Sequence, residues 1–424
     1  MATDAPARPR TWSRPLSERG LFAVVAGPLL VLYLLTATWT YPLLNDAFSN
    51  SATAWSIANE GTVYLEEYRG HEETYGFISW IVPAGDSIAS KYPPGAALTA
   101  VPLSLLWPGD LTTQTFTPED YEYPWEEIYP VLEEPTTRVL VPPGPGAATA
   151  AAVTAAAMGL LAICFRRLGG SQNQAIAGGF VAGLATSAWP VAADQLWQHG
   201  PAMLWIALAL VLSEGRPLGS GLAYGAAILT RPPLALIAAG AGLVRSWRER
   251  SLRGVVLVGA GSLVGLIAFL AFNGAVYGDA SVSAGYGPVF QDRLFTVFNP
   301  GWYARNLFDA LFSRQVGVLL LSPFLLVLLP GLVAGWRAAP AWARGAALGG
   351  IAYLLVQFKA NRATGGDFLG YRYPLEAMVA AAPVLFLSYR ESVAKRPPLR
   401  RPFLLAVAVS VVVQGLASVG IGFL

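Results

Sequence analysis

The chain has 424 residues, of which 54% are hydrophobic and only 13% are charged. Soluble globular proteins carry about 25% charged residues, and a soluble domain with so few charges could not cover this much apolar surface. The composition therefore excludes an ordinary cytosolic enzyme, and it excludes a disordered chain, which would be polar and charge-rich. The net charge of +2 gives no indication of nucleic-acid binding.

Long apolar segments recur along the chain, and a helix needs about 20 apolar residues to cross a membrane. The segment 217–244 is interrupted by Arg231-Pro232-Pro233, which indicates a hairpin of two short helices. We therefore predict an all-α polytopic membrane protein with about 11 transmembrane helices, within a range of 10 to 13. The other predicted spans are 21–41, 142–165, 174–192, 199–213, 254–273, 316–335, 345–358, 373–389 and 402–424.

The start of the chain is arginine-rich and precedes the first apolar run. An arginine-rich start and an apolar run are also typical of a cleavable signal, but this run is long and no small-residue cleavage site follows it. We therefore expect 1–20 to be a cytoplasmic segment and 21–424 to be one transmembrane domain that begins with an uncleaved helix.

One predicted loop, 42–140, is very long and contains fifteen acidic and three basic residues. Apolar residues at helical spacing predict a helix over 47–60. The segment 95–107 is apolar but too short to span a membrane, which indicates an interfacial or re-entrant helix. The acidic, proline-rich segment 109–138 predicts a surface lid, and a second long outer segment is expected over 274–315.

The charges divide strongly between the two sides of the predicted membrane. The side of the N-terminus carries eighteen basic and five acidic residues, whereas the other side carries ten basic and twenty-one acidic residues. Because cytoplasmic loops are enriched in Lys and Arg, we expect the N-terminus in the cytoplasm, and the long acidic loop and the C-terminus outside the plasma membrane. The eighteen basic residues are Arg8, Arg10, Arg14, Arg19, Arg166, Arg167, Arg216, Arg245, Arg248, Arg250, Arg253, Arg337, Arg344, Arg390, Lys395, Arg396, Arg400 and Arg401.

Ionisable residues at the outer edge of the membrane are the candidates for chemistry, and Asp46 is the first of them. It directly follows the first predicted span, and a carboxylate near apolar walls can act as a base. The same residue could instead be the N-cap of the helix predicted to start near Phe48. The sequence alone does not decide between these two roles.

The segment 91–95 carries the next candidates. Its two prolines fix the chain, and Gly95 permits close approach of another backbone, so Lys91 and Tyr92 would lie at the head of the predicted 95–107 helix. Helix N-termini attract anions, which indicates a lipid phosphate as the ligand. The alternative is an ordinary turn with a lysine that extends to the membrane surface.

The chain has only two histidines. His199 joins two predicted spans and could donate to a phosphate or transfer a proton, or it could be a structural capping residue. His71 lies in a Glu-rich stretch and is expected to be solvated. Two histidines so far apart lack the spacing of metal ligands, so we expect no dedicated zinc site. We expect no cofactor, and the sequence leaves a divalent metal open without supporting it. The single Cys164 excludes an intramolecular disulfide.

The remaining candidates are cations beside or within apolar segments. An arginine within a membrane is costly and usually faces a cavity or a partner, which singles out Arg231. Lys359, Asp367 and Arg372 crowd the segment 359–372, whose glycines allow backbone N–H groups to approach an anion. Several cations in one outer segment indicate phosphate binding, with attachment to the membrane surface as the alternative.

Taken in order, these motifs resemble the GT-C superfamily of integral-membrane glycosyltransferases, near its protein-mannosyltransferase-like and arabinosyltransferase-like bacterial members. Many members carry a pair of acids after the first span, whereas Asn45-Asp46-Ala47 offers one. The segments that carry the resemblance are Asp46 in a long first loop, 90–95, 196–201, 230–232, and 365–368 followed by Arg372.

The resemblance implies a GT-C-like fold and a polyprenyl-phosphate-linked sugar as donor. The sugar, arabinofuranose or mannose, would pass with inversion to a cell-envelope glycan, glycolipid or protein on the outer face, with Asp46 as the base. Asp367 or Glu60 would bind the acceptor or act as a second acid. The residues implied to bind the donor phosphate are Lys91, Tyr92, His199, Arg231, Lys359 and Arg372.

Two other classes of protein remain as alternatives. A transporter or flippase for lipid-linked saccharides would share the phosphate-binding cations, but it would predict inverted repeats and polar residues deep in several spans. A non-catalytic membrane scaffold would leave Arg231 and the glycine-rich cation segment unexplained. The sequence contains no phosphate-loop motif and no serine-hydrolase elbow, so nucleotide hydrolysis and serine hydrolase chemistry have no support.

Overall fold

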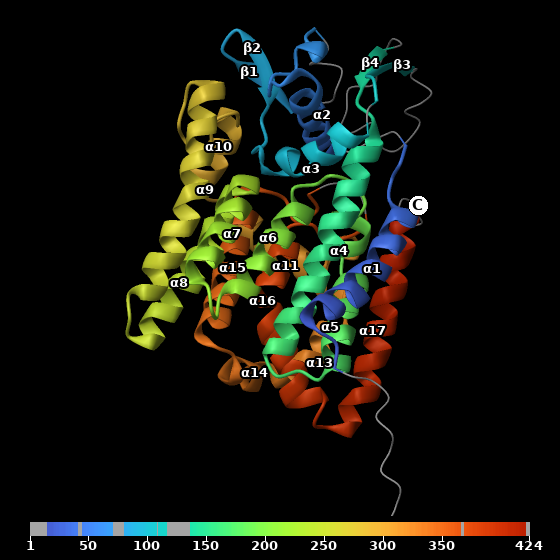
Figure 1. Cartoon of the computed structure of the whole chain (residues 1–424), viewed down its shortest axis with the longest axis vertical. Coiled ribbons are helices and arrows are strands. Elements are labelled where there is room, and N and C mark those ends of the chain that lie inside the picture. The colour runs from blue at the N-terminus through green and yellow to red at the C-terminus, as the bar shows by residue number, and fades with distance from the viewer. Residues whose placement is uncertain are drawn as a thin grey trace, which may run out of the picture.

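The computed structural model describes residues 15–40, 45–70, 80–107, 109–116, 136–365 and 369–420. Most of these residues form helices, which run together as an elongated bundle (Figure 1). The α-helices are α1 (Glu18–Thr36), α2 (Asn45–Glu60), α3 (Gly95–Leu106), α4 (Pro143–Arg167), α5 (Gln172–Leu184), α6 (His199–Leu212), α7 (Pro217–Thr230), α8 (Ala235–Glu249), α9 (Arg253–Tyr277), α10 (Pro288–Phe295), α11 (Pro300–Phe312), α12 (Val318–Leu321), α13 (Phe324–Leu328), α14 (Leu332–Ala338), α15 (Ala341–Ala360), α16 (Pro374–Ser388) and α17 (Pro397–Ser418).

The two ends of the bundle differ. One end carries the described part of residues 45–140, which we call the cap layer (top of Figure 1). The opposite end, which we call the basic end, contains Arg167 at the end of α4, Arg248 in the last turn of α8 and Arg337 in α14. Besides α2 and α3, the cap layer contains two antiparallel hairpins, formed by β1 (Ile81–Ala84) with β2 (Ser87–Ser90) and by β3 (Thr112–Phe116) with β4 (Thr136–Leu140).

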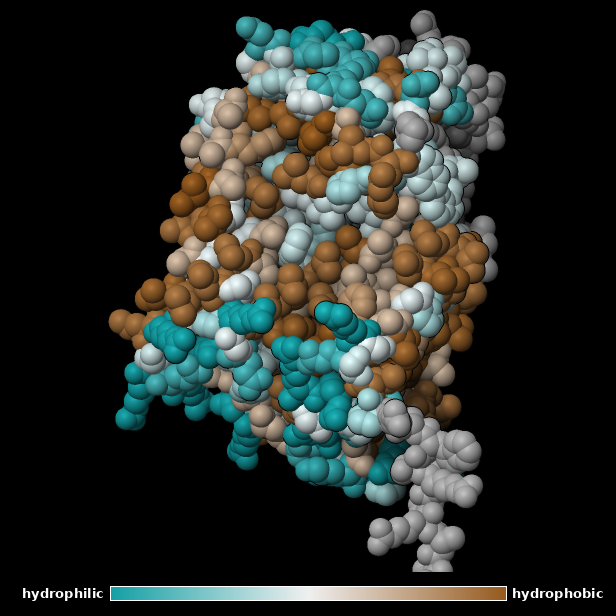
Figure 2. All heavy atoms as spheres, in the orientation of Figure 1, coloured by the Kyte–Doolittle hydropathy of each residue, from teal (hydrophilic) through white to brown (hydrophobic). Residues whose placement is uncertain are grey.

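Four helices of the described chain, α1, α4, α9 and α17, are long and apolar enough to cross a membrane. Of these, α4 is central, because 78% of its most apolar stretch is buried inside the protein. The same share is only 17% for α9 and 22% for α17. On the face shown in Figure 2, apolar surface forms a band between polar surfaces at the two ends. The protein is therefore mostly helical and has the apolar helices expected of an all-α membrane protein.

Most helix boundaries agree with the apolar segments of the sequence. The predicted hairpin over 217–244 has its break where it was expected: α7 ends at Thr230 and α8 begins at Ala235, because the prolines between them cannot continue a helix. The segment 316–335, predicted as one helix, is instead divided into α12, α13 and α14. Pro323 precedes α13 and Pro330 precedes α14, which explains the two breaks.

The long loops contain more structure than the sequence indicated. Helices α2 and α3 lie where helices over 47–60 and 95–107 were expected. The two short hairpins were not predicted from the sequence. In the first of them Gly85, with φ +66°, allows the two-residue turn that joins β1 to β2. The segment 274–315 contains α10 and α11, and the middle of the predicted lid, 117–135, lies outside the described residues.

A small aromatic core holds the cap layer together. The ring centroid of Phe48 on α2 lies 5.2 Å from that of Trp80 and 5.9 Å from that of Tyr68, and the centroids of Tyr68 and Trp80 are 5.7 Å apart. Each such pair stabilises the packing by about 0.5–1.5 kcal/mol beyond the buried area. This core fixes the start of α2, with Asp46, relative to the end of β2, which leads to Tyr92.

Helices α7 and α9 approach each other to backbone contact. A methyl group added to Gly265 of α9 would lie 2.0 Å from the carbonyl oxygen of Gly225 on α7. Small residues allow membrane helices to pack closely and gain van der Waals contact. The glycines at this crossing are therefore required by the packing.

We expect Gly265→Ala to lower the melting temperature of the purified protein in detergent, because the helices must separate, and overpacking costs about 1–3 kcal/mol. Gly259→Ala on the same helix is the control, because its new methyl group meets nothing within 4 Å. The control should keep or raise the melting temperature, since alanine favours helix. Equal melting temperatures for the two variants would contradict a tight α7–α9 contact.

Candidate functional site

Five of the predicted site residues lie close together where the cap layer meets the bundle. Asp46 comes from the first turn of α2, Tyr92 from the segment between β2 and α3, and His199 from the start of α6. Arg231 follows α7 and Arg372 precedes α16. Hydrogen bonds join Tyr92 and Arg372 to Asp46, and Arg231 to His199. Segments more than 300 residues apart in the sequence therefore meet in one site.

Asp46 is held as an ionised carboxylate. The hydroxyl of Tyr92 donates to Oδ1 at 2.5 Å, and Nη1 of Arg372 donates to Oδ2 at 3.0 Å. Burial acts to raise the pKa of Asp46, but Arg372 and the Tyr92 hydrogen bond lower it by more, so the pKa lies below the ordinary value of 3.8. Because α2 begins at Asn45, Asp46 lies inside the helix rather than at its N-cap.

Tyr92 and Lys91 form the wall of the site that leads into α3. Burial and the adjacent Asp46 carboxylate raise the pKa of Tyr92, so its hydroxyl stays protonated and donates. Nζ of Lys91 lies 5.4 Å from the centroid of the Tyr92 ring, and burial lowers the pKa of Lys91 although Asp46 opposes this. Among the described residues, the Lys91 ammonium donates no hydrogen bond, which leaves it available to an anion.

Aromatic rings and guanidinium groups alternate through the site. The Cζ atom of Arg372 lies 4.9 Å from the ring centroid of Trp197 and 4.8 Å from that of Tyr373. The Cζ atom of Arg231 lies 5.7 Å from the Tyr373 ring and 5.8 Å from the Tyr353 ring. We call these five residues the arginine ladder. Cation–π contacts of about 0.5–2 kcal/mol each oppose the repulsion between the two guanidinium groups.

Each guanidinium of the arginine ladder has its own carboxylate. Arg372 pairs with Asp46, and Nη1 of Arg231 lies 3.0 Å from Oε1 of Glu376. Glu376 is completely buried. It also accepts a hydrogen bond from the Tyr353 hydroxyl, at 3.3 Å from Oε2.

His199 completes the hydrogen bonding around Glu376. Its Nδ1 lies 2.8 Å from Oε1 of Glu376, and an ionised carboxylate can only accept, so Nδ1–H is the donor. Nη1 of Arg231 lies 2.8 Å from Nδ1 and 3.1 Å from Nε2 of the same ring. The imidazole and the guanidinium therefore both contact Oε1 of Glu376 and contact each other.

Glu376 was not among the residues selected from the sequence. It lies inside the apolar run 373–389, which was recognised only as a span. The signal that could have found it is a single acidic residue within that span, because carboxylates within membranes are costly and usually functional. Trp197, Tyr353 and Tyr373 were missed because an apolar pattern does not show which rings face a buried cation.

Two glycines leave space for the site. A methyl group on Gly95, the first residue of α3, would lie 2.6 Å from the backbone nitrogen of Thr230, the residue before Arg231. Gly365 has φ +57°, and a methyl group there would lie 2.5 Å from Nε of Arg372. Gly95 therefore lets α3 approach the backbone that precedes Arg231, and Gly365 leaves room for the guanidinium of Arg372.

Three predicted site residues are not seen in this cluster. Nζ of Lys359 donates to the carbonyl oxygen of Leu294 on α10 at 2.6 Å. Glu60 ends α2, so it lies about 21 Å along the helix axis from Asp46 at about 1.5 Å per residue. Asp367, the other candidate second acid, lies outside the described residues, as does His71.

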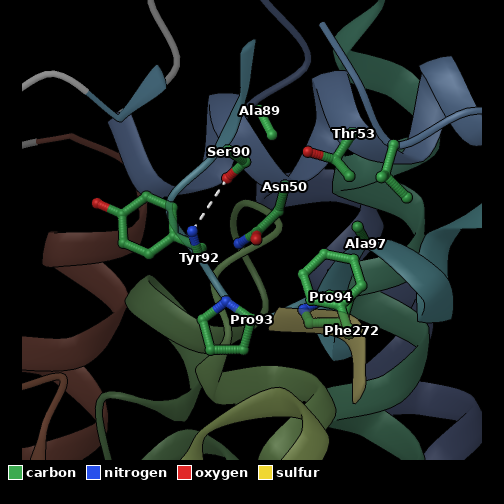
Figure 3. A pocket seen from close by; sticks show the side chains of 10 residues that line it. Asn50, Thr53, Ala89, Ser90, Tyr92, Pro93, Pro94, Ala97 and Phe272 are labelled. Atoms are coloured by element: carbon green, nitrogen blue, oxygen red, sulfur yellow. Dashed lines mark hydrogen bonds between the residues drawn. The ribbon is translucent and has the colours of Figure 1, made fainter. Parts of the chain in front are cut away.

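A hollow in the cap layer lies beside Tyr92 (Figure 3). Asn50, Thr53 and Phe272 are among the residues that line it. The hydroxyl end of Tyr92 points away from the hollow in Figure 3, and this hydroxyl donates to Asp46. Tyr92 therefore separates the hollow from Asp46.

Within the described ranges, no group of three or more His, Cys, Asp or Glu side chains is arranged to hold a metal ion. No protein-family model matches the chain, and no curated protein or solved structure matches it. The function must therefore be inferred from the chemistry of the site itself.

We expect Gly365→Ala to destabilise the protein more than Gly278→Ala. Both glycines have positive φ, +57° and +71°, so both variants carry the backbone strain of about 1–2 kcal/mol. Only at Gly365 does the new methyl group also meet Arg372, whereas at Gly278 it meets nothing within 4 Å. Thermal unfolding in detergent measures the difference, and equal losses in the two variants would refute the close approach to Arg372.

Proposed function

We propose that the protein is an integral-membrane glycosyltransferase of the GT-C kind. It would move a sugar, arabinofuranose or mannose, from a polyprenyl phosphate to a cell-envelope glycan, glycolipid or protein. The observation that carries the proposal is an ionised carboxylate, Asp46, held by Tyr92 and Arg372 at one end of an apolar helix bundle, with Lys91 beside it. This arrangement combines a proton acceptor with cations suited to a phosphate.

The arrangement of the helices supports a topology of eleven crossings. These are α1, the six helices α4 to α9, the broken segment from α12 to α14, and α15, α16 and α17. The basic end contains arginines of α4, α8 and α14, so the distribution of Lys and Arg favours a cytoplasmic location for that end. The cap layer and Asp46 would then face the outside of the plasma membrane, where lipid-linked sugars reach cell-envelope acceptors.

In the proposed reaction, the acceptor hydroxyl oxygen forms a bond to the anomeric carbon as the bond from that carbon to the phosphate oxygen breaks. The acceptor proton passes to the Asp46 carboxylate, and the electron pair of the broken bond stays on the phosphate. Attack from the face opposite the phosphate inverts the anomeric configuration. Because its low pKa makes Asp46 a weak base, the proton moves late, once the forming bond has made the hydroxyl more acidic.

The leaving phosphate gains negative charge as the bond breaks, and fixed cations stabilise that charge most effectively in a site shielded from water. Arg372 and Lys91 are the cations closest to this role, because Arg372 pairs with Asp46 and Lys91 lies against Tyr92. A phosphate leaves readily without a proton donor, so one carboxylate is sufficient for the chemistry.

A transporter or flippase for lipid-linked saccharides is the second candidate. The observation that favours it is the buried cluster of His199, Arg231 and Glu376 within the helices, since transporters use intramembrane ionisable groups. The two functions differ in product: a flippase moves the lipid between leaflets unchanged, whereas a transferase removes its sugar. Proteoliposomes with a labelled lipid-linked sugar distinguish the two outcomes.

We expect Asp46→Asn to lower kcat for sugar transfer by about 10²–10⁴-fold, the usual contribution of a general base. The assay is transfer in proteoliposomes that contain polyprenyl-phosphate mannose or arabinose. Glu60→Gln, at the other end of the same helix, is the matched control and should transfer at the wild-type rate. Wild-type kcat in Asp46→Asn, with a donor that the wild type uses, would remove Asp46 from the mechanism.

The pH dependence of transfer should follow the lowered pKa of Asp46. A lowered pKa keeps the carboxylate ionised at and above the ordinary value of 3.8, so activity should fall only below that value. Tyr92→Phe removes a hydrogen bond that lowers this pKa, so the loss of activity on acidification should begin at a higher pH. Tyr286→Phe is the control, because its ring packs 6.5 Å from that of Tyr92 and it donates no hydrogen bond to Asp46 in the described structure. If the activity of Tyr92→Phe and of the wild type falls at the same acidic pH, this role of Tyr92 is refuted.

A further inference from the structure

We infer that Glu376 is a positioning residue for the donor phosphate site, which it organises by fixing Arg231 and, through the ring of Tyr373, the orientation of Arg372. The inference rests on the proposed function and extends it to a buried carboxylate that the mechanism above does not use.

The surroundings of Glu376 show what it holds in place. It lies on α16, and its carboxylate meets donors from three other elements: His199 on α6, Arg231 after α7 and Tyr353 on α15. With all three in contact, the carboxylate has no free face toward the reacting atoms. It can affect the reaction only through the groups that it binds.

Packing alone is a weak reason for a carboxylate at this position. Burying a charge is costly, and replacing a buried ion pair with apolar residues of similar volume is often neutral or stabilising. Glu376 and Arg231 are 0% and 8% exposed as side chains, so both are fully subject to this cost. A role in orienting Arg231 gives a reason for the pair.

Arg231 and Arg372 both contact the ring of Tyr373. The Cζ atoms of Arg231 and Arg372 lie 5.7 and 4.8 Å from the ring centroid of Tyr373, and the Tyr373 hydroxyl accepts from Nη2 of Arg372 at 2.9 Å. A change in the place of Arg231 therefore alters the ring that orients Arg372. Arg372 is the guanidinium that reaches Asp46.

Two roles for Glu376 predict changes of opposite sign. If it only added negative charge near the phosphate, Glu376→Gln would tighten phosphate binding, because an unfavourable charge is removed. If it positions the arginine ladder, the same variant should weaken binding, because Arg231 loses the charged partner that fixes it. The sign of the change in affinity therefore distinguishes the two roles.

The test uses the full-length protein in nanodiscs and measures the Kd for polyprenyl phosphate without a sugar, together with KM and kcat for transfer. The variants are Glu376→Gln, Arg231→Gln and the double variant. Glu391→Gln, which makes the same change in a residue paired with Arg390 and Lys395, is the matched control and should bind like the wild type.

We expect Glu376→Gln to raise Kd and the donor KM about tenfold, an effect within the range for directly coupled neighbours. In the Arg231→Gln background, Glu376→Gln should cause no further rise. The double variant is expected to fold even if Glu376→Gln does not, because it leaves no uncompensated buried charge. Tyr353→Phe, which removes only the 3.3 Å hydrogen bond, should raise Kd by about twofold.

Unchanged or tighter binding in Glu376→Gln would overturn the inference, and so would independent effects of Glu376→Gln and Arg231→Gln on Kd. If Glu376→Gln does not fold, binding by Tyr353→Phe like the wild type would overturn it. A wild-type protein that binds polyprenyl phosphate but transfers no sugar from any donor would overturn the proposed function, while the binding data would still decide the role of Glu376.

Discussion

Two guanidinium groups, that of the buried Arg231 and that of the half-buried Arg372, share the ring of Tyr373, and each is neutralised by a carboxylate from another part of the chain. An unpaired arginine in the apolar interior costs several kcal/mol, so the fold must bring Asp46 to Arg372 and Glu376 to Arg231. Glu376 is supplied by a helix of the bundle. Asp46 is supplied by the cap layer, whose aromatic core fixes α2 above the ends of the bundle helices.

The two ion pairs differ in accessibility. The side chains of Arg372 and Asp46 are 11% and 23% exposed, so this pair is partly open to its surroundings. The side chains of Arg231 and Glu376 are 8% and 0% exposed and are enclosed by the helices. In the proposed mechanism the outer pair takes part in the chemistry and the inner pair fixes the geometry. The arginine ladder joins them, so the inner pair can influence the reaction without contact with substrate.

Much of the fold could be predicted, because apolar runs show where the long helices lie and prolines show where helices break. The break at Pro232 and Pro233 follows from the missing N–H groups, and several site residues stood out because charges are scarce in this sequence. The partners of Glu376 and the rings of the arginine ladder could not be predicted, because the side chains that a buried charge meets depend on how helices distant in sequence pack. The hairpins of the cap layer also escaped prediction, because the strands are short, and the pairing of β1 with β2 depends on a single turn at Gly85.

We expect the cap-layer site to bind a lipid phosphate beside Asp46. A cryo-EM reconstruction of the protein in nanodiscs with polyprenyl phosphate would locate that phosphate. We expect phosphate density within hydrogen-bonding distance of Arg372 and Lys91, with the lipid tail against the apolar band. A phosphate bound elsewhere on the protein, with the pair of Asp46 and Arg372 unchanged and Lys91 free, would contradict it.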